Sequence, residues 1–433
     1  MLEELVGTST AIEHAINGEE LTFDDGMEIL TDDNLHVVGA AADIVRKKLV
    51  GDTVSFAASY YMNYTNLCAA SCQMCAFYRK GDEDDAYTLT PDQIEKRVAA
   101  AKDLGATEVH IVGGFHPDLQ LDYYEQMMSA IKQKHPDMTI KAFTAAEIFF
   151  LSKLTKNSVT EILSRLKDAG LDSMPGGGAE LFHPDLQLDY YEQMMSTIKQ
   201  KHPDMTIKAF TAAEIFFLSK LTKNSVTEIL SRLKDAGLDS MPGGGAELFH
   251  PDVRTKIIRG KCTGQQWLDT IEVAHNLGIK SNVTMLYGHI EKPEHIVDHL
   301  IKIRELQKKT NGFITLIPLK FSLDNTELEK EHKVEHESSS IYDLKIIALS
   351  RLMLAQTLKN ISVYWVAYGT KLAQVALSHG GNDLVGTAFS EEIYRAAGKP
   401  TNSSLLELAT LAKEIGRIPI QRNTFFKTLQ TFT

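Results

Sequence analysis

The sequence predicts an α/β fold, organised as a complete or partial (β/α)8 barrel of the TIM type. Short runs rich in β-branched and aromatic residues alternate with helical stretches, and this alternation is typical of parallel βαβ units. The chain has 433 residues, of which 43% are hydrophobic, so it can bury one large core. Glycine-rich or cysteine-rich runs follow several of the predicted strands, at the end where such barrels carry their active sites.

The predicted elements follow one another in a regular order. Residues 1–52 look helical, with Thr22 and Asp25 placed as a helix cap, and residues 53–433 form the predicted barrel domain. Strands are predicted at Thr53–Asn66, Thr107–Gly113, Met138–Thr144, Leu171–Met174, Lys280–Tyr287, Gly312–Leu319 and Ile361–Val366. Helices are predicted from Thr90 to Gly105, Leu121 to Lys134, Ser158 to Gly170, Thr263 to Gly278 and Leu344 to Leu358, most of them with a capping residue at the start or a glycine at the end.

A tandem duplication interrupts this order. Residues 115–181 recur as 182–248 with one change, because Thr197 stands where the first copy has Ala130. Solenoid repeats diverge and usually number three or more, so a near-identical pair indicates a recent accident. A closed barrel has a fixed strand number. We therefore expect one unit of chain to be extruded, exposing apolar residues such as Ile148-Phe149-Phe150, and we expect the fourth strand with its glycine run to come from the second copy.

Three cysteines lie close together, at Cys68, Cys72 and Cys75, directly after the first predicted strand. This spacing lets three thiolates bind three irons of a [4Fe-4S] cluster and leaves the fourth iron open to a small molecule. A structural zinc site is the alternative, but zinc normally takes four protein ligands, and the remaining cysteine, Cys262, is remote. The spacing therefore favours a cluster that takes part in chemistry.

This motif resembles that of the radical S-adenosylmethionine (SAM) enzymes, with Met74 where the family usually has an aromatic residue. In that family the open iron holds the amino and carboxylate groups of SAM, and an electron from the cluster releases a 5′-deoxyadenosyl radical. Gly113-Gly114 resembles the glycine motif that contacts the SAM amino group. The resemblance thus implies a [4Fe-4S] cluster as cofactor and SAM as substrate.

Other residues at predicted strand ends are candidates for the same site. The run Gly243-Gly244-Gly245 would let backbone groups approach a ligand, although a glycine run after a strand is often only a turn. Arg254 would suit the SAM carboxylate through a bidentate contact, as would the nearby Arg259 and Lys261, but all three could equally be surface charges. Glu247 and His289 are the candidates for proton handling, although a lone histidine such as His289 or His116 is more often structural.

Longer stretches resemble the aminofutalosine synthase family of the futalosine route to menaquinone. They are Cys75–Arg79, Leu171–Glu180, Thr284–His289 and Gly381–Thr387. The resemblance implies that the adenosyl radical adds to the enol ether of 3-[(1-carboxyvinyl)oxy]benzoate to give 6-amino-6-deoxyfutalosine. The sister dehypoxanthine futalosine cyclase shares the Pro-Gly-Gly-Gly-Ala-Glu run and stays an alternative, as does a non-catalytic relative disrupted by the duplication. Cationic candidates for the substrate carboxylates are Arg79, Lys320 and Lys371.

Charge and hydropathy bear on partners and location. The net charge of −12 and the lack of a basic stripe argue against a nucleic-acid partner. No apolar run approaches the roughly 18 residues of a membrane span, and the start of the chain lacks a positively charged leader. We expect a cytoplasmic enzyme whose partners are a small aryl enol-ether substrate and a one-electron donor such as flavodoxin or ferredoxin.

Overall fold

The computed structural model describes residues 9–57, 59–70, 78–103, 105–174, 188–201, 203, 206–258, 262–323, 328, 331, 333–385 and 404–432. The chain divides into two compact units, which are described separately here. Unit 1 comprises residues 1–57, 243–386 and 407–433, and unit 2 comprises residues 58–242 and 387–406. Nearly all the strand pairs within these units are parallel, which confirms the predicted α/β class.

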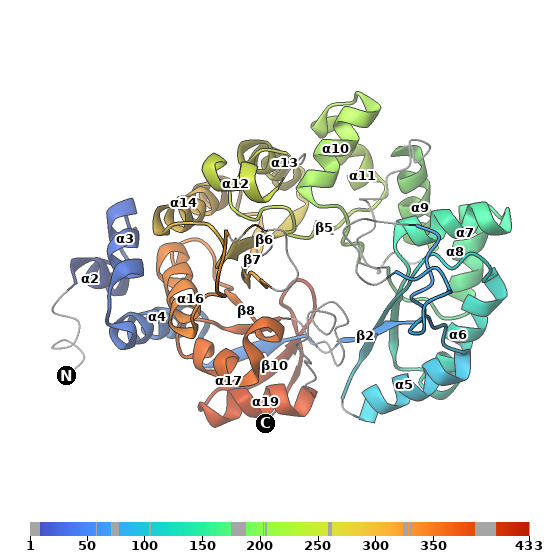
Figure 1. The fold of residues 1–433 in the computed structure, drawn as a ribbon, viewed down its shortest axis with the longest axis horizontal. Helices are drawn as coiled ribbons and strands as arrows, with labels where there is room; N and C mark the ends of the chain where they lie inside the picture. Colours follow the sequence, from blue (N-terminus) through green and yellow to red (C-terminus); the bar gives the residue numbers. More distant parts are fainter. Residues whose placement is uncertain are drawn as a thin grey trace. The chain divides into compact units, whose positions relative to one another are not determined.

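The larger sheet of unit 1 joins the two ends of the chain (Figure 1). β1 (Thr53–Phe56) lies between β9 (Asp383–Val385) and β10 (Ile418–Arg422) and is parallel to both. β8 (Ser362–Tyr364) extends the sheet beyond β9, and β11 (Thr428–Thr431) is antiparallel to β10 at the opposite edge. Such pairing between residues more than 300 positions apart cannot be read from local patterns.

A second parallel pair of unit 1 places two strand ends at one edge. β6 (Lys280–Tyr287) and β7 (Phe313–Lys320) pair so that Tyr287 lies beside Lys320 at their carboxyl ends. An isolated bridge between Leu316 and Ile361 links β7 to the start of β8. The observed β6 has the predicted bounds, and β7 is shifted by one residue.

Helices of unit 1 surround these strands. The N-terminal segment is helical as expected, and the Thr22–Asp25 capping box is present. α4 packs on α16, and α3 packs on both α14 and α16. The helices of this unit are α2 (Thr10–Asn17), α3 (Phe23–Thr31), α4 (Leu35–Val50), α12 (Pro251–Ile257), α13 (Gly264–Asn276), α14 (Pro293–Thr310), α16 (Ser340–Leu354) and α17 (Trp365–Leu377). A further helix, α19 (Leu405–Glu414), begins two residues before the last segment of the unit.

Unit 2 has a parallel sheet with the order β2 (Ser59–Asn63), β3 (Glu108–Val112) and β4 (Thr139–Ala142). The first predicted strand, Thr53–Asn66, is wrong as a single element, because its halves are β1 and β2 and lie in different units. Its uniform run of β-formers gave no sign that the first half pairs with the C-terminal strands. The predicted strand Leu171–Met174 is reduced to one bridge, from Ser173 to Lys141.

The helices of unit 2 include one that the sequence analysis missed. α7 (Ala145–Thr155) begins at the capping box formed by Thr144 and Glu147, directly after β4. The remaining helices are α5 (Pro91–Asp103), α6 (Leu121–Lys134) and α8 (Val159–Asp168) in the single-copy region and first copy, and α9 (Leu188–Lys201), α10 (Ala212–Thr222) and α11 (Val226–Asp235) in the second copy, which ends with β5 (Ser240–Met241).

The helices of the two copies correspond where they are described, whereas β4 of the first copy is reduced in the second copy to a single bridge at Lys208. The caps of α7 and α10 are equivalent, and the bridge from Lys208 to Ser240 repeats the one from Lys141 to Ser173. α9 of the second copy packs on α8 of the first, and α11 packs on both α9 and α10. The helices of the second copy thus pack directly against those of the first. The expected extrusion of one unit is therefore not observed among the described helices.

The exposure of apolar side chains in the repeat also differs from the expectation. Ile148, expected to be exposed, is fully buried. In the second copy, Phe217 is 49% exposed and Leu221 is 39% exposed. Their counterparts in the first copy, Phe150 and Leu154, are half-buried, so the same residues differ in exposure between the two copies.

None of the helices in the described ranges combines the length and the apolar character needed to cross a membrane.

A buried histidine in unit 1 predicts a pH dependence of stability. His275 binds Thr310 and Ser281 through its two ring nitrogens, and burial lowers its pKa to about 3. In the unfolded chain its pKa is near 6.5, so the unfolded state binds a proton that the folded state does not. The contribution of His275 to folding stability is therefore fully present above about pH 6.5, and it is lost as the pH falls toward 3.

The expected loss from this residue alone is about 2 kcal/mol between pH 7 and pH 5. His275→Gln should reduce the pH dependence of the unfolding midpoint over this range, measured by circular dichroism. His336→Gln is the control, because the His336 side chain is 86% exposed. Equal pH slopes in wild type and His275→Gln would contradict this account.

Candidate functional site

Cys68, the first cysteine of the motif, lies beside the glycine pair in unit 2. The Phe115 N–H donates to its Sγ at 3.3 Å, and the Ala69 N–H donates to the Phe115 carbonyl at 2.7 Å. A peptide N–H directed at a sulfur stabilises the thiolate that binds iron. Cys72 and Cys75 lie outside the described residues.

Both glycines of the pair after β3 are required by close packing. A Cβ on Gly114 would collide with the Leu67 carbonyl oxygen and would lie 3.0 Å from the Cβ of Cys68. A Cβ on Gly113 would collide with the ring of Tyr64. The pair is therefore pressed against the start of the cysteine loop, as a shared SAM and cluster site requires. The described part of this site fits the cluster.

Two basic residues that follow the cysteines have protein partners. Arg79 binds both carboxylate oxygens of Asp85, at 2.6 and 2.5 Å, so a substrate carboxylate would have to compete with Asp85. Lys80 donates to the carbonyls of Cys68, Ala69 and Ala70 at 3.0 to 3.3 Å. Sequence analysis missed this role of Lys80, which ties down the first turn of the cysteine loop.

Glu147 is a buried carboxylate beside the glycine pair that the sequence analysis also missed. Its Oε1 accepts from the Gly113 N–H at 3.1 Å and from the Tyr64 hydroxyl at 3.4 Å. Its Oε2 accepts from the Thr144 N–H at 2.6 Å. Burial raises the pKa of Glu147 to about 7, although these hydrogen bonds act in the opposite direction. The signal in the sequence was the Thr144-Ala-Ala-Glu147 capping box.

In unit 1, two glycines of the run after β5, Gly243 and Gly245, have a structural reason. A Cβ on Gly243 would lie 2.8 Å from the Cα of Val283, and the Gly243 carbonyl accepts from Thr284. Gly244 accepts at its carbonyl from the Trp267 indole N–H, and Gly245 has a φ of +79°. The run is thus a tight turn packed on β6, and ligand contact by its backbone remains a proposal.

Glu247 ends this turn in a strained conformation. Its φ of +45° lies in the left-handed region that residues other than glycine rarely adopt. Its carbonyl accepts from the Leu286 N–H of β6 at 2.9 Å, and its side chain is half-buried. Such strain often occurs at functional sites, so Glu247 stays a candidate for proton handling.

Arg254 holds the glycine turn from behind. Its buried guanidinium donates to the carbonyls of four residues, at 2.6 to 3.3 Å: Gly245, Ala246, Leu248 and Cys262. Burial lowers its pKa from the ordinary value. These contacts occupy the donors proposed for the SAM carboxylate, and the alternatives Arg259 and Lys261 lie outside the described residues.

His289 is fully engaged after β6. Its Nδ1 accepts from the Ile290 N–H at 2.7 Å and lies 3.1 Å from Glu291, while its Nε2 lies 3.2 Å from the Leu286 carbonyl. Glu291 in turn accepts from the N–H groups of Gly288 and His289. Both ring nitrogens therefore have partners in the turn, which weakens the case for His289 as a proton carrier.

A buried polar network lies at the carboxyl ends of β6 and β7. Asp343 is fully buried and accepts from Lys320 at 2.9 Å, from Ser338 at 2.6 Å and from Tyr287 at 3.1 Å. The Tyr287 hydroxyl also lies 2.6 Å from the hydroxyl of Tyr368. Lys320 is thus neutralised by Asp343, whereas Lys371, the third proposed cation, is exposed on α17. Ser338, Asp343 and Tyr368 escaped the sequence analysis, because they come from segments remote in sequence from the predicted strand ends.

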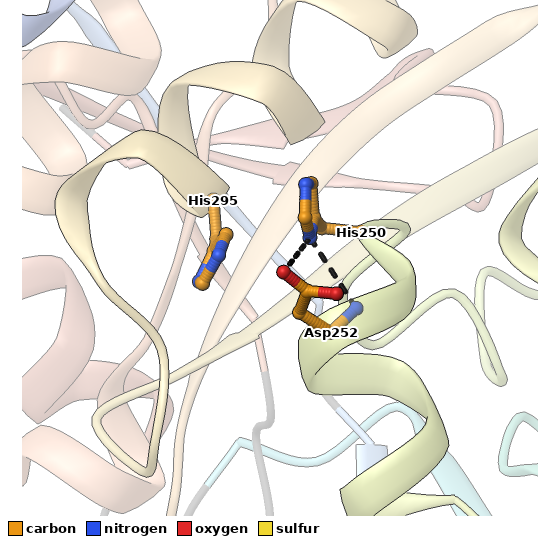
Figure 2. A group of neighbouring side chains, drawn as sticks. All are labelled: His250, Asp252 and His295. Atoms are coloured by element: carbon orange, nitrogen blue, oxygen red, sulfur yellow. Dashed lines mark hydrogen bonds and ion pairs between the residues drawn. The ribbon is translucent and has the colours of Figure 1, made fainter.

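Figure 2 shows a third cluster, formed by His250, Asp252 and His295. Their possible ligand atoms lie within 4.8 Å of one another, and the two imidazole rings are 4.5 Å apart. However, His250 Nδ1 accepts from the Asp252 N–H, and His295 Nδ1 accepts from the Lys292 N–H. In the neutral rings Nε2 then carries the proton, so neither histidine offers a free lone pair. We interpret the cluster as paired caps of α12 and α14.

Family models match most of the chain, including the part that holds the cysteine loop and the glycine pair. The model of the radical SAM superfamily matches residues 62–178 and again residues 176–303, one match for each copy of the repeat. The model of the CofH/MqnC C-terminal region matches residues 310–432. The chain belongs to the radical SAM superfamily. It is accordingly an enzyme that uses a [4Fe-4S] cluster and SAM.

Curated relatives carry two names at equal similarity. An aminodeoxyfutalosine synthase of Thermus thermophilus is 32% identical over 422 residues, which cover 97% of this chain and 95% of the relative. A 5-amino-6-(D-ribitylamino)uracil–L-tyrosine 4-hydroxyphenyl transferase of Methanopyrus kandleri is 32% identical over 394 residues, covering 90% and 89%. This radical SAM enzyme is therefore of the aminofutalosine synthase and CofH/MqnC type.

Solved structures agree on the fold. Methylornithine synthase (PylB) matches with a TM-score of 0.54 and 15% identity, covering 95% of this chain and 97% of that one. The hydrogenase maturase HydG from Carboxydothermus hydrogenoformans also gives 0.54, with 17% identity and coverage of 98% and 81%. The predicted radical SAM fold class is thus confirmed.

Proposed function

We propose that this enzyme joins the 5′-deoxyadenosyl group of SAM to the enol ether of 3-[(1-carboxyvinyl)oxy]benzoate, giving 6-amino-6-deoxyfutalosine. The observation that carries the proposal is the close packing of Cys68 against Gly114, together with the resemblance of Thr284–His289 to the synthase family. The similarity to relatives named aminodeoxyfutalosine synthase extends over almost the whole chain.

Each unit contributes residues with a definite role in this proposal. Cys68, with Cys72 and Cys75, would hold the cluster, which when bound supplies the single electron that the reaction needs. Gly113 and Gly114 leave room for backbone contact with the SAM amino group. In unit 1, Glu247 is the proposed group for moving a proton.

Two other reactions must be tested. The relatives include tyrosine 4-hydroxyphenyl transferases as well as aminodeoxyfutalosine synthases, and the Pro-Gly-Gly-Gly-Ala-Glu run is shared with dehypoxanthine futalosine cyclase. The purified chain should be reconstituted with iron and sulfide without oxygen, reduced with dithionite, and given SAM with each substrate in turn. These are the enol-ether benzoate, dehypoxanthine futalosine, and tyrosine with 5-amino-6-(D-ribitylamino)uracil. We expect aminodeoxyfutalosine by mass spectrometry from the first only. Product from either of the others instead would overturn the proposed substrate.

The duplication calls for a matched control in the same assay. Deleting residues 182–248 joins Leu181 to Phe249, which is the junction that the chain already has after Leu248. If the full chain lacks SAM cleavage while the deleted chain has it, the protein as it stands is a disrupted relative. We expect cleavage in both, because the helices of the two copies correspond and pack directly against one another.

A further inference from the structure

We propose that Glu147 is a positioning residue for the SAM-binding glycine pair, holding the Gly113 peptide in place from the buried side. This inference rests on the proposed role of Gly113-Gly114 in binding SAM. It does not depend on which substrate accepts the adenosyl group.

The contacts of Glu147 connect three segments of unit 2. The carboxylate bridges the Gly113 N–H at 3.1 Å and the Thr144 N–H at 2.6 Å, and the Tyr64 hydroxyl completes its shell at 3.4 Å. Gly113 follows β3, Thr144 follows β4 and Tyr64 follows β2, so one side chain ties together the carboxyl ends of three adjacent strands. Only 6% of Glu147 is exposed, so these partners replace water as its hydrogen-bond donors.

The position of Gly113 is transmitted directly to the cysteine loop. The Gly114 N–H donates to the Thr65 carbonyl at 3.0 Å, and Gly114 packs against the Leu67 carbonyl with no room for a Cβ. The next residue, Phe115, donates its N–H to Cys68 Sγ. A shift of the Gly113 peptide would therefore move the backbone that faces Cys68, where the SAM amino group is expected.

The charge of Glu147 also suits a cationic ligand. SAM carries a sulfonium group, and a carboxylate behind the glycine peptide favours positive charge on its other side. Burial raises the pKa of Glu147, whereas three donors favour its ionised form. A bound cation would favour the same ionised form.

The second copy supplies an internal control. Glu214 occupies the same place in an identical sequence and makes the same capping box, accepting from the Thr211 N–H. However, the glycine pair precedes only the first copy, and Glu180 and Leu181 stand at the corresponding positions before the second. Glu147→Gln and Glu214→Gln therefore change the same capping residue, and only the first alters a contact with Gly113.

A glutamine at position 147 cannot reproduce both contacts. Its amide has one accepting oxygen and one donating nitrogen, so it can satisfy the N–H of Gly113 or of Thr144 but not both. Glu147→Asp keeps the charge but is one methylene shorter, so it should span the two N–H groups poorly. This second variant gives an answer even if the glutamine variant folds badly.

The experiment compares the three variants with wild type by two measurements. Hydrogen–deuterium exchange of the apoprotein, followed by mass spectrometry, should show faster exchange in the peptide around Gly113 for both Glu147 variants and not for Glu214→Gln. Titration of the reduced, reconstituted holoenzyme with SAM, followed by electron paramagnetic resonance, should show affinity weakened about tenfold for Glu147→Gln and less for Glu147→Asp. Glu214→Gln should bind SAM as wild type does.

The outcomes separate this inference from the proposed function. Equal exchange and equal SAM affinity in Glu147→Gln and Glu214→Gln would overturn the positioning role. If wild type makes no aminodeoxyfutalosine but the difference between the two variants persists, the proposed substrate is wrong and the role of Glu147 stands. Thermal unfolding of both variants, measured alongside, shows that the compared samples are folded.

Discussion

Cys68→Ser is expected to abolish SAM cleavage, with a loss of about a thousandfold or more, and to leave purified protein with little bound iron or sulfide. A serine hydroxyl is a poor ligand for iron, and three ligands already leave one iron of the cluster open. Without the cluster the reaction has no source for its electron. Iron and sulfide analysis, the visible spectrum and 5′-deoxyadenosine formation measure the effect.

The control for this variant is Cys262→Ser. Cys262 is buried near Arg254, and its carbonyl accepts from the Arg254 guanidinium, a contact that serine preserves. We expect this variant to bind iron and sulfide as wild type does. Full iron content in Cys68→Ser, or stoichiometric zinc in the anaerobically purified wild type, would contradict the assignment of the cluster.

Replacing Arg254 with methionine should have the second-largest effect, destabilising unit 1 by about 3 to 5 kcal/mol. The four carbonyls that its guanidinium satisfies would be left without their donor in the interior. Since Gly245, Ala246 and Leu248 all belong to or adjoin the glycine turn, we also expect SAM cleavage to fall with stability. Chemical denaturation and SAM-cleavage assays measure the two effects.

Two further variants show whether geometry or charge matters at this position. Arg254→Lys keeps the charge but lacks the planar fork of five donors, so it should recover only part of the lost stability. Lys256→Ala removes an exposed charge from the same helix, α12, and should change stability by less than about 0.5 kcal/mol. A mild effect of Arg254→Met, similar to that of Lys256→Ala, would show that the glycine turn is stable without the Arg254 hydrogen bonds.

Elements with strong local signals were predicted well. α6 and β6 have the predicted bounds, and the capping residues Thr22, Ser158 and Thr263 begin helices as expected. In contrast, the division of Thr53–Asn66 between two sheets depended on β9 and β10, which lie more than 300 residues away. α7 was missed although its capping box is present, because the predicted strand Met138–Thr144 included the capping residue, whereas β4 ends at Ala142.

The residues of the candidate site also include some that local sequence patterns predicted and some whose partners they could not predict. Cys68 and Gly113-Gly114 could be identified because a fixed spacing of ligands and a glycine pair are local properties of the chain. Arg254 was predicted to bind a ligand, yet it is buried with its donors directed at backbone carbonyls. A guanidinium in a sequence gives no sign of whether carbonyls or a ligand will face it.

The sequence alone predicted the kind of chemistry, because the close spacing of three thiols favours a cluster with an open iron whatever the fold around them. Only the tertiary structure decided which other side chains serve that site. Glu147 and Glu214 lie in copies of the same sequence, and they differ because Gly113 and Tyr64 come from strands outside the repeat. Contacts made across strands depend on the packing of remote segments, and no local pattern records them.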